Sequence, residues 1–172
     1  MFTTDTVTPP TRGIGTNTDR TKLHVEMTDP KIHDEARIRL ATREGRYTDL
    51  RRALVNTMAA AGRPVTIAEI LEANPGVSQS SAYRNVSALL DAGVARRVTG
   101  SDDHGRFELS EDLVGKHHHH LVCRTCGKVS DLPPSPRLER AFAEVARSAS
   151  SDAGFAVLEH RFDLVGLCAD CR

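Results

Sequence analysis

Two pairs of cysteines constrain this 172-residue chain more than any other feature of its sequence. All four cysteines fall in CxxC motifs, Cys123/Cys126 and Cys168/Cys171. A CxxC turn places two thiolates on one side of a tetrahedron, and a second turn completes a four-thiolate zinc site. Because the motifs lie far apart in sequence, the zinc ion has to tie an early hairpin of its domain to the end of a later strand. Such a closed shell is structural, and redox switching of the paired thiolates is the competing interpretation.

Composition and hydropathy place the chain in a reducing compartment. Hydrophobic residues make up 39% and charged residues 27% of the sequence, which is typical of a globular protein. We find no apolar run long enough to span a membrane and no signal-peptide pattern at the start. We therefore expect a cytoplasmic protein without membrane contact, in which thiols bind zinc rather than form disulfides.

A run of four histidines, His117 to His120, directly precedes the first CxxC motif. Its internal position excludes an expression tag. Successive side chains of a β-strand point to opposite faces, so His117 and His119 share one face and His118 and His120 the other. Two imidazoles at i and i+2 can chelate one ion. The run therefore predicts two metal sites back to back, against the alternative of a polar edge strand.

Three further residues are candidate ligands for these sites. His160 falls on the apolar face of a predicted strand, where a lone histidine is usually a core residue with a satisfied hydrogen bond. The two candidate sites favour a ligand role instead, with His160 and Glu139 completing the site of His117 and His119. Glu108, from the preceding domain, is the candidate partner of His118 and His120. An ion at that second position would bridge two domains.

The first half of the chain has the pattern of a winged helix-turn-helix. Apolar residues at helical spacing predict a helix over 48–61, and a Thr-x-x-Glu capping box starts the next at Thr66. Asn74-Pro75-Gly76 breaks that helix, and a third helix runs from about residue 78 to Gly93. Residues 94–98 and 106–109 then form a β-hairpin.

The third helix of such a fold lies in the major groove of DNA. Net charge is zero, but seven arginines against two acidic residues lie between Ala36 and Arg63. A merely solvated helix surface is the alternative. Our candidate DNA-contacting residues are Ser80, Ser81, Tyr83, Arg84 and Arg51.

The second half is predicted to be α+β, with strands over 117–123 and 128–132, a helix over 137–149 and a long strand over 155–167. We expect four segments: a flexible arm (1–33), a winged-helix DNA-binding domain (34–110), a hinge loop (111–116) and a dimerisation and metal-binding domain (117–172).

Several motifs together resemble the ferric uptake regulator superfamily of bacterial metal sensors. They are Ser81-Ala82-Tyr83-Arg84, Arg106-Phe107-Glu108-Leu109, the segment from His117 to Gly127, and Cys168-Ala169-Asp170-Cys171. The resemblance covers roughly residues 48–172. It implies a homodimeric repressor that binds double-stranded operator DNA when a divalent ion is bound.

The resemblance also implies roles for individual residues. The four cysteines match the structural zinc ligands, and Glu108, His118 and His120 match the inter-domain sensing ligands. His117, His119, Glu139 and His160 match a further metal site, with Glu139 reached through a one-residue insertion in the preceding proline-rich segment.

Two departures from the family pattern concern the sensing site. Pro64 stands where iron and peroxide sensors usually carry a histidine, and the segment between Glu108 and His117 is a few residues longer than usual. His104 or His33 is therefore a candidate fourth ligand. Two imidazoles and a carboxylate suit Fe²⁺, Mn²⁺, Ni²⁺ or Zn²⁺ as the regulatory ion.

The sequence therefore predicts a metal-dependent repressor of metal-homeostasis genes rather than an enzyme. A peroxide-stress sensor of the same superfamily is the alternative. Two other classes stay open: a zinc hydrolase, for which no HExxH motif is present, and a zinc-stapled interaction module that does not bind DNA.

Overall fold

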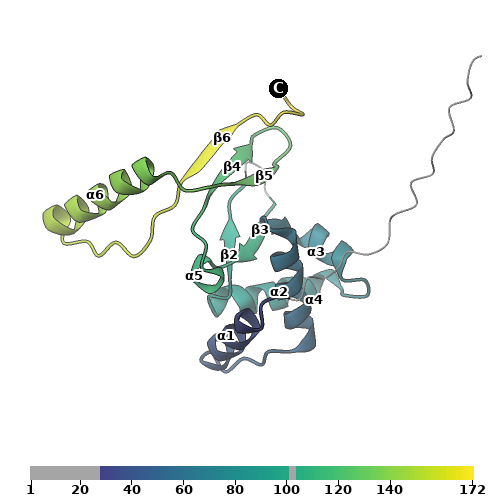
Figure 1. The fold of residues 1–172 in the computed structure, drawn as a ribbon. Coiled ribbons are helices and arrows are strands. Elements are labelled where there is room, and N and C mark those ends of the chain that lie inside the picture. Colours follow the sequence, from purple (N-terminus) through teal and green to yellow (C-terminus); the bar gives the residue numbers. More distant parts are fainter. Residues whose placement is uncertain (1–27, 101–103) are drawn as a thin grey trace, which may run out of the picture.

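The computed structural model describes residues 28–100 and 104–172, and within them the chain forms two units (Figure 1). Most of the predicted arm and the centre of the predicted wing turn lie outside the described residues. The first unit holds four helices and a small sheet, and the second is built on another three-stranded sheet. None of the described helices is long and apolar enough to cross a membrane.

The first two helices are delimited by local capping. Helix α1 (Pro30–Ala41) begins after Asp29, whose side chain accepts a hydrogen bond from the Lys31 backbone. Helix α2 (Asp49–Ala61) begins after Thr48 and ends at Gly62, which has a φ of 57°. A left-handed residue at this position favours glycine, so the chain turns sharply there. Helix α1 starts four residues before the predicted domain boundary at residue 34.

A helix-turn-helix follows. Strand β1 (Val65–Thr66) leads into α3 (Ile67–Ala73), which carries the predicted capping box between Thr66 and Glu69. Helix α4 (Gln79–Asp91) starts after Ser78, whose hydroxyl accepts a hydrogen bond from the Ser81 backbone. Both helices turn buried aliphatic residues toward α2, so the outer face of α4 is left exposed.

The wing consists of β2 (Ala95–Val98) and β3 (Arg106–Leu109), and β3 lies between β1 and β2. All pairs are antiparallel, and the register sets Arg96 opposite Glu108. Fifteen buried apolar residues from the helices and the wing form one core. This core fixes the position of β3 and therefore of Glu108.

The segment expected to be a hinge loop contains a short helix, α5 (Glu111–Val114). Leu113 and Val114 pack against the core of the first unit, which explains why these residues are helical. Gly115, with a φ of 66°, ends the helix. The connection between the two units is therefore shorter than the predicted loop.

The second sheet has the order β5-β4-β6, with β4 (His119–Cys123) in the centre. Strand β5 (Val129–Leu132) pairs with β4 antiparallel, and β6 (Asp163–Gly166) pairs with it in parallel. Helix α6 (Pro136–Ala153) connects β5 to β6 and projects away from the body (Figure 1).

The prediction of one long strand over 155–167 is wrong, because only its last part is a strand. The parallel register pairs Asp163 with His120, the second residue of β4. Residues before Asp163 therefore extend beyond the start of β4 and, within the described residues, have no strand of this sheet beside them. The alternating apolar residues of this segment are exposed rather than buried in a sheet. Phe155 is 64% and Leu158 94% exposed.

The fold class predicted from sequence is confirmed: a winged helix-turn-helix precedes a small α/β unit that carries four neighbouring cysteines. The second unit has little apolar core of its own. Its buried apolar cluster consists of Val122 and Val129 together with Val98 from the wing.

Candidate metal centres

The first histidine cluster lies between the two units, and we call it the even cluster. It contains Glu108, His118, His120 and Asp131, whose potential ligand atoms all lie within 4.8 Å of one another. His118 Nε2 lies 3.1 Å from Glu108 Oε2, and His120 Nε2 lies 3.3 Å from Glu108 Oε1. Glu108 comes from the wing, His120 and Asp131 from the second sheet, and His118 from the residues just before β4, so the cluster joins the units.

The surroundings of the two ring nitrogens of His120 suit a metal ligand. His120 Nδ1 lies 3.2 Å from Asp163 Oδ1, so a proton on Nδ1 can be donated to this carboxylate. His120 Nε2 is buried and faces Glu108 Oε1 at 3.3 Å, without a hydrogen-bond partner of good geometry among the described residues. A lone pair in this position, oriented by a carboxylate on the opposite ring nitrogen, is typical of a metal ligand.

Glu108 is held as an anion. Burial alone raises its pKa, but hydrogen bonding to His120 and the charge of Arg96 outweigh this and lower the pKa to about 2. Arg96 Nε donates to Glu108 Oε1 at 2.6 Å. The side chain of Glu108 is only 6% exposed, so this carboxylate is a buried negative charge facing two imidazoles.

Asp131 is the member of the even cluster that the sequence reasoning missed. Its Oδ1 lies 4.0 Å from His118 Nε2, and the hairpin register sets it opposite His120. The candidates His33 and His104 do not join the cluster. His33 is buried in the first unit against the Tyr47 hydroxyl, and His104 is exposed beside the wing.

The second histidine cluster, which we call the odd cluster, lies within the C-terminal unit. It contains His117, His119, Glu139 and His160, again with ligand atoms within 4.8 Å. His119 Nε2 lies 2.7 Å from Glu139 Oε1, and His160 Nε2 lies 3.2 Å from Glu139 Oε2. His117 Nε2 is 3.2 Å from His160 Nε2. All four residues therefore converge on one point near the start of α6.

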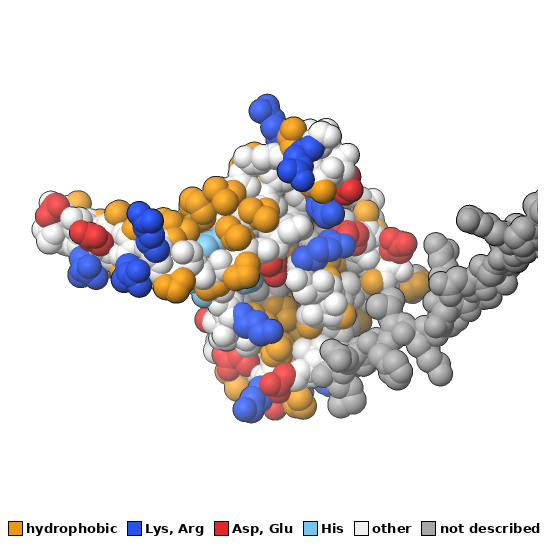
Figure 2. Space-filling model, turned by 45° about the horizontal axis from the view of Figure 1, so that its top comes forward, with side chains coloured by type: hydrophobic (Ala, Val, Ile, Leu, Met, Phe, Trp, Pro, Cys, Tyr) orange, Lys and Arg blue, Asp and Glu red, His pale blue; other side chains and the backbone are white. Residues whose placement is uncertain are grey.

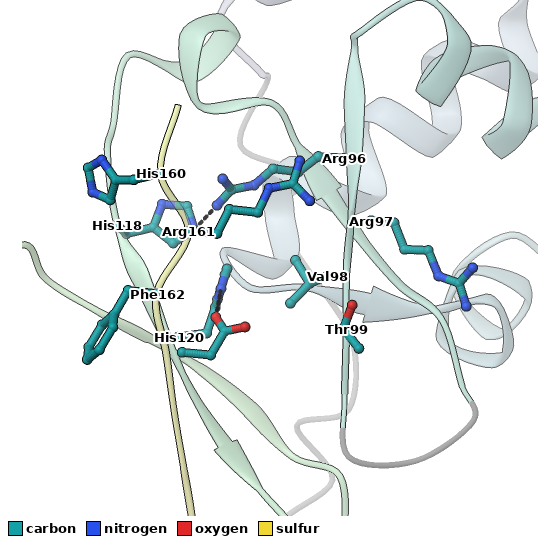
Figure 3. Close-up of a pocket in the computed structure, with 10 residues that line it drawn as sticks. Arg96, Arg97, Val98, Thr99, His118, His120, His160, Arg161 and Phe162 are labelled. Carbon is teal, nitrogen blue, oxygen red and sulfur yellow. Dashed lines mark hydrogen bonds and ion pairs between the residues drawn. The ribbon is translucent and has the colours of Figure 1, made fainter. Parts of the chain in front are cut away.

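The odd and even histidines separate as predicted from strand geometry. Strand β4 begins only at His119, but the alternation extends back through His118 and His117. Figure 3 shows His118 and His120 beside the wing residue Arg96, in a pocket between the two units. His160 reaches the odd cluster from the irregular segment before β6, not from the predicted strand.

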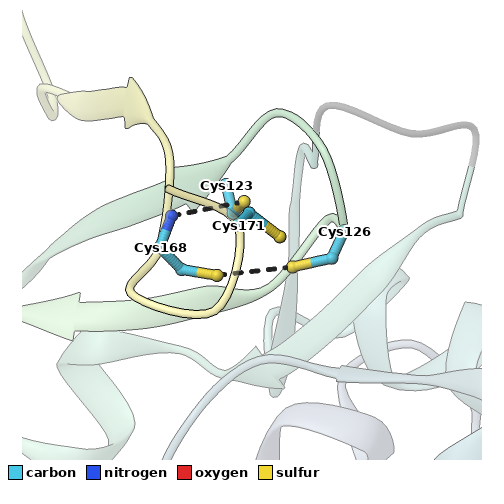
Figure 4. A group of neighbouring side chains, drawn as sticks. All are labelled: Cys123, Cys126, Cys168 and Cys171. Carbon is cyan, nitrogen blue, oxygen red and sulfur yellow. Dashed lines mark hydrogen bonds between the residues drawn. The ribbon is translucent and has the colours of Figure 1, made fainter.

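The four cysteines form the third cluster, with all four sulfurs close together (Figure 4). Cys126 Sγ and Cys168 Sγ are 3.7 Å apart, well beyond the ~2.05 Å of a disulfide. Backbone N–H groups of Cys126 and Cys168 point at Cys123 and lower the pKa of its thiol to about 6. The pKa of Cys171 is raised to about 12, because its thiol is hydrogen-bonded to the neighbouring sulfurs. One thiolate thus forms readily. Four thiolates this close together would repel one another unless a cation compensates their charge.

The predicted DNA-contacting residues lie on or beside α4. Tyr83 is 52% exposed, and Arg84 is also exposed on the outer face. Ser80 and Ser81 lie in the first turn, where the Ser78 hydroxyl contacts both residues. Arg51 differs, because its guanidinium donates to Asn85 Oδ1 and to the Arg46 carbonyl. Arg51 therefore links α2 to α4 through its hydrogen bond with Asn85.

Comparison with known proteins decides the family. The profile of the Ferric uptake regulator family matches residues 42–165, which include all but two members of the three clusters. The chain belongs to the ferric uptake regulator family. Members of this family are metal-responsive transcription regulators rather than enzymes.

Curated relatives of the family are peroxide regulators. The chain is 30% identical to the peroxide-responsive repressor PerR of Staphylococcus saprophyticus over 131 residues, 74% of this chain and 82% of the relative. It is 29% identical to PerR of Staphylococcus aureus over the same shares of both chains.

Solved structures of the family share the fold. The ferric uptake regulator Fur of Helicobacter pylori, described as having three functional metal-binding sites, superposes with a TM-score of 0.67. It is 21% identical and covers 84% of this chain and 93% of its own. A zinc-bound manganese uptake regulator is 25% identical, with a TM-score of 0.57 over 80% of this chain and 98% of its own.

Proposed function

We propose that this chain is a metal-dependent repressor of the ferric uptake regulator type that controls metal-homeostasis genes through operator DNA. The observation that carries the proposal is the even cluster, in which Glu108 from the wing faces His118, His120 and Asp131 from the second unit. Two imidazoles and two carboxylates form a donor set that suits Fe²⁺, Mn²⁺, Zn²⁺ or Ni²⁺.

The allosteric element is the angle between the two units. Glu108 is positioned by the core of the winged helix, and His120 is positioned by β4, which His118 directly precedes. A divalent ion held by all of these residues would favour one arrangement of the units over others. Such a difference in contacts between two states is what an allosteric switch requires.

We propose a structural zinc ion for the four cysteines and a second metal for the odd cluster. The zinc would join the β4–β5 turn to the segment after β6 and compensate for the small core of this unit. In the odd cluster all ligands belong to the C-terminal unit. An ion there would rigidify that unit without directly fixing the wing.

A homodimer is supported by the apolar surface of the C-terminal unit. Figure 2 shows hydrophobic side chains along the projecting helix α6 and at its base. Val145 on α6 is 66% exposed and Val165 on β6 is 65% exposed. Exposed apolar surface of this kind is typical of a protein–protein interface. We propose that a second copy of the chain covers it, which would set two α4 helices to read two half-sites.

The decisive experiment is selection of DNA from a random duplex pool by the zinc-loaded protein, with and without Mn²⁺. We expect a specific sequence to be enriched only with Mn²⁺, and its binding to weaken steeply with salt, because Arg84 and neighbouring groups contact phosphates. Enrichment that is the same after EDTA treatment would contradict metal dependence. Failure to enrich any sequence would favour the interaction module without DNA binding.

A peroxide-responsive repressor is the second candidate, and it is favoured by the names of the staphylococcal relatives. Pro64 departs from the pattern of iron and peroxide sensors alike, because both usually carry a histidine there, so it does not separate the two candidates. Treating the Fe²⁺-loaded and Mn²⁺-loaded proteins with hydrogen peroxide separates the two candidates. Loss of operator binding only in the Fe²⁺-loaded form would support the peroxide sensor.

A further inference from the structure

Glu111, the first residue of α5, contacts both histidine clusters through its two carboxylate oxygens. Its Oε2 lies 2.6 Å from His117 Nδ1, the ring nitrogen that faces away from the odd cluster. Its Oε1 accepts from the His118 backbone N–H at 3.3 Å and lies 2.8 Å from an Arg96 guanidinium nitrogen. The side chain is 22% exposed, so these contacts are partly shielded from solvent.

Arg96 continues the contact to the even cluster. Its Nε donates to Glu108 Oε1, and its terminal nitrogen lies 3.4 Å from His118 Nε2. Figure 3 shows Arg96 reaching toward His118, whereas its neighbour Arg97 points away from both clusters. Arg96 thus contacts Glu108 through Nε and Glu111 through a terminal guanidinium nitrogen.

We propose that Glu111 and Arg96 couple the two clusters, so that filling the odd cluster raises the metal affinity of the even cluster. The inference rests on the proposed function, because it assigns metal to both clusters. Glu111 and Arg96 act here as positioning residues rather than as ligands.

The direction of the coupling follows from the order of the contacts. A ligand role for His117 Nε2 fixes its ring, and the Nδ1–H then holds Glu111 in one place. Glu111 in turn orients Arg96, and Arg96 holds Glu108 beside His118. Ordering long side chains costs conformational entropy, so the second ion binds to side chains that the first has already ordered.

Glu111→Gln breaks the link with minimal change of shape. An ionised carboxylate accepts on both sides, but an amide has one acceptor and one donor end. The NH₂ group of the amide therefore faces another donor, either His117 Nδ1–H or the Arg96 guanidinium, and one of the two contacts is lost. Asp112→Asn is the matched control, since Asp112 is the next residue on α5, is 70% exposed and pairs with Arg39 instead.

The experiment is a Co²⁺ titration of the zinc-loaded protein in a double-mutant cycle of E111Q and E139Q. Glu139 is an odd-cluster ligand at the start of α6, so E139Q disables that cluster alone. Absorption spectra of H120A and E139Q, each of which keeps one cluster, assign the bands of the two sites. The dissociation constant for Co²⁺ at the even cluster is then measured in the wild type, in E111Q, in E139Q and in the double variant.

We expect E139Q to weaken Co²⁺ binding at the even cluster about fivefold or more in the wild-type background. It should have no further effect in the E111Q background, and D112N should retain the wild-type coupling. Equal effects of E139Q in both backgrounds, or no effect in either, would overturn the link. H160Q replaces E139Q if the latter loses its melting transition. Absence of two Co²⁺ sites in the wild type would instead contradict the proposed function itself.

Discussion

Loss of one cysteine should unfold the C-terminal unit and spare the winged helix. The buried apolar cluster at the second sheet consists of two valines of that sheet and Val98 of the wing, which at ~1.5–3 kcal/mol each contribute about 5–9 kcal/mol. A four-thiolate zinc site contributes about 10–16 kcal/mol. Zinc binding is therefore a larger contribution to the folding free energy of this unit than valine burial. Cys168→Ser should remove most of the zinc contribution. The winged helix has fifteen buried apolar residues and needs no metal to keep its core.

Hydrogen exchange measured by mass spectrometry separates the two units within one sample. In Cys168→Ser, amides of β4, β5 and β6 should exchange fast, while those of α2 and α4 stay protected, and the dimer should dissociate. Thr125→Ala is the control, because it changes the same turn without removing a sulfur. Protection of β4 and dimer retention in Cys168→Ser at the wild-type level would refute the reasoning.

Three further predictions test the two histidine clusters, the DNA surface and the helix-turn-helix. His120→Ala should abolish Mn²⁺-dependent operator binding in fluorescence anisotropy, whereas the adjacent His119→Ala should only shift the Mn²⁺ midpoint; equal behaviour would contradict the alternating assignment. Arg84→Ala should lower operator affinity by about 1–3 kcal/mol and leave the dimer intact by light scattering, and unchanged affinity would exclude α4 from the interface. Burial alone raises the pKa of Glu69, but its hydrogen bond with Arg63 outweighs this and lowers the pKa. Its stabilising effect is therefore full above the unfolded value of about 4.3 and is lost as the pH falls through the lower folded value. Glu69→Gln should cost about 1 kcal/mol at pH 7 in urea unfolding, with a gap that narrows in acid, and a gap independent of pH would contradict this.

The sequence predicts most of the candidate ligands because their spacing alone determines their geometry. Alternation along a strand is a local property, so the separation of His119 from His120 needs no knowledge of tertiary structure. The two CxxC turns are equally local. For these residues, residue type and spacing are sufficient.

Asp131 and Glu111 show what spacing cannot provide. Asp131 joins the even cluster through the hairpin register, which sets it opposite His120, and pairing the two strands of the predicted hairpin would have identified it. Glu111 meets His117 because α5 folds against the winged-helix core, which a predicted loop does not anticipate.

The segment before β6 was predicted incorrectly for a different reason. Its alternating apolar residues have the period of a strand, but a strand also needs a partner with free backbone groups. Leu158 is 94% exposed in the single chain, so its pattern fits a surface that a second copy covers. His160 nevertheless lies in the odd cluster, although the strand face on which the sequence analysis placed it does not form.

The parallel pairing of β4 with β6 has a consequence for the order in which the protein matures during synthesis. His120 and its partner Asp163 are 43 residues apart, so the ribosome releases the central strand long before the strand that completes its sheet. Contacts of such high sequence separation form slowly, whereas the winged helix is already complete upstream. In this interval the nascent chain exposes Cys123 and Cys126 with only half of their zinc ligands. Stable binding of the proposed zinc ion would therefore be a late event, and the winged helix would be complete before the proposed metal sites.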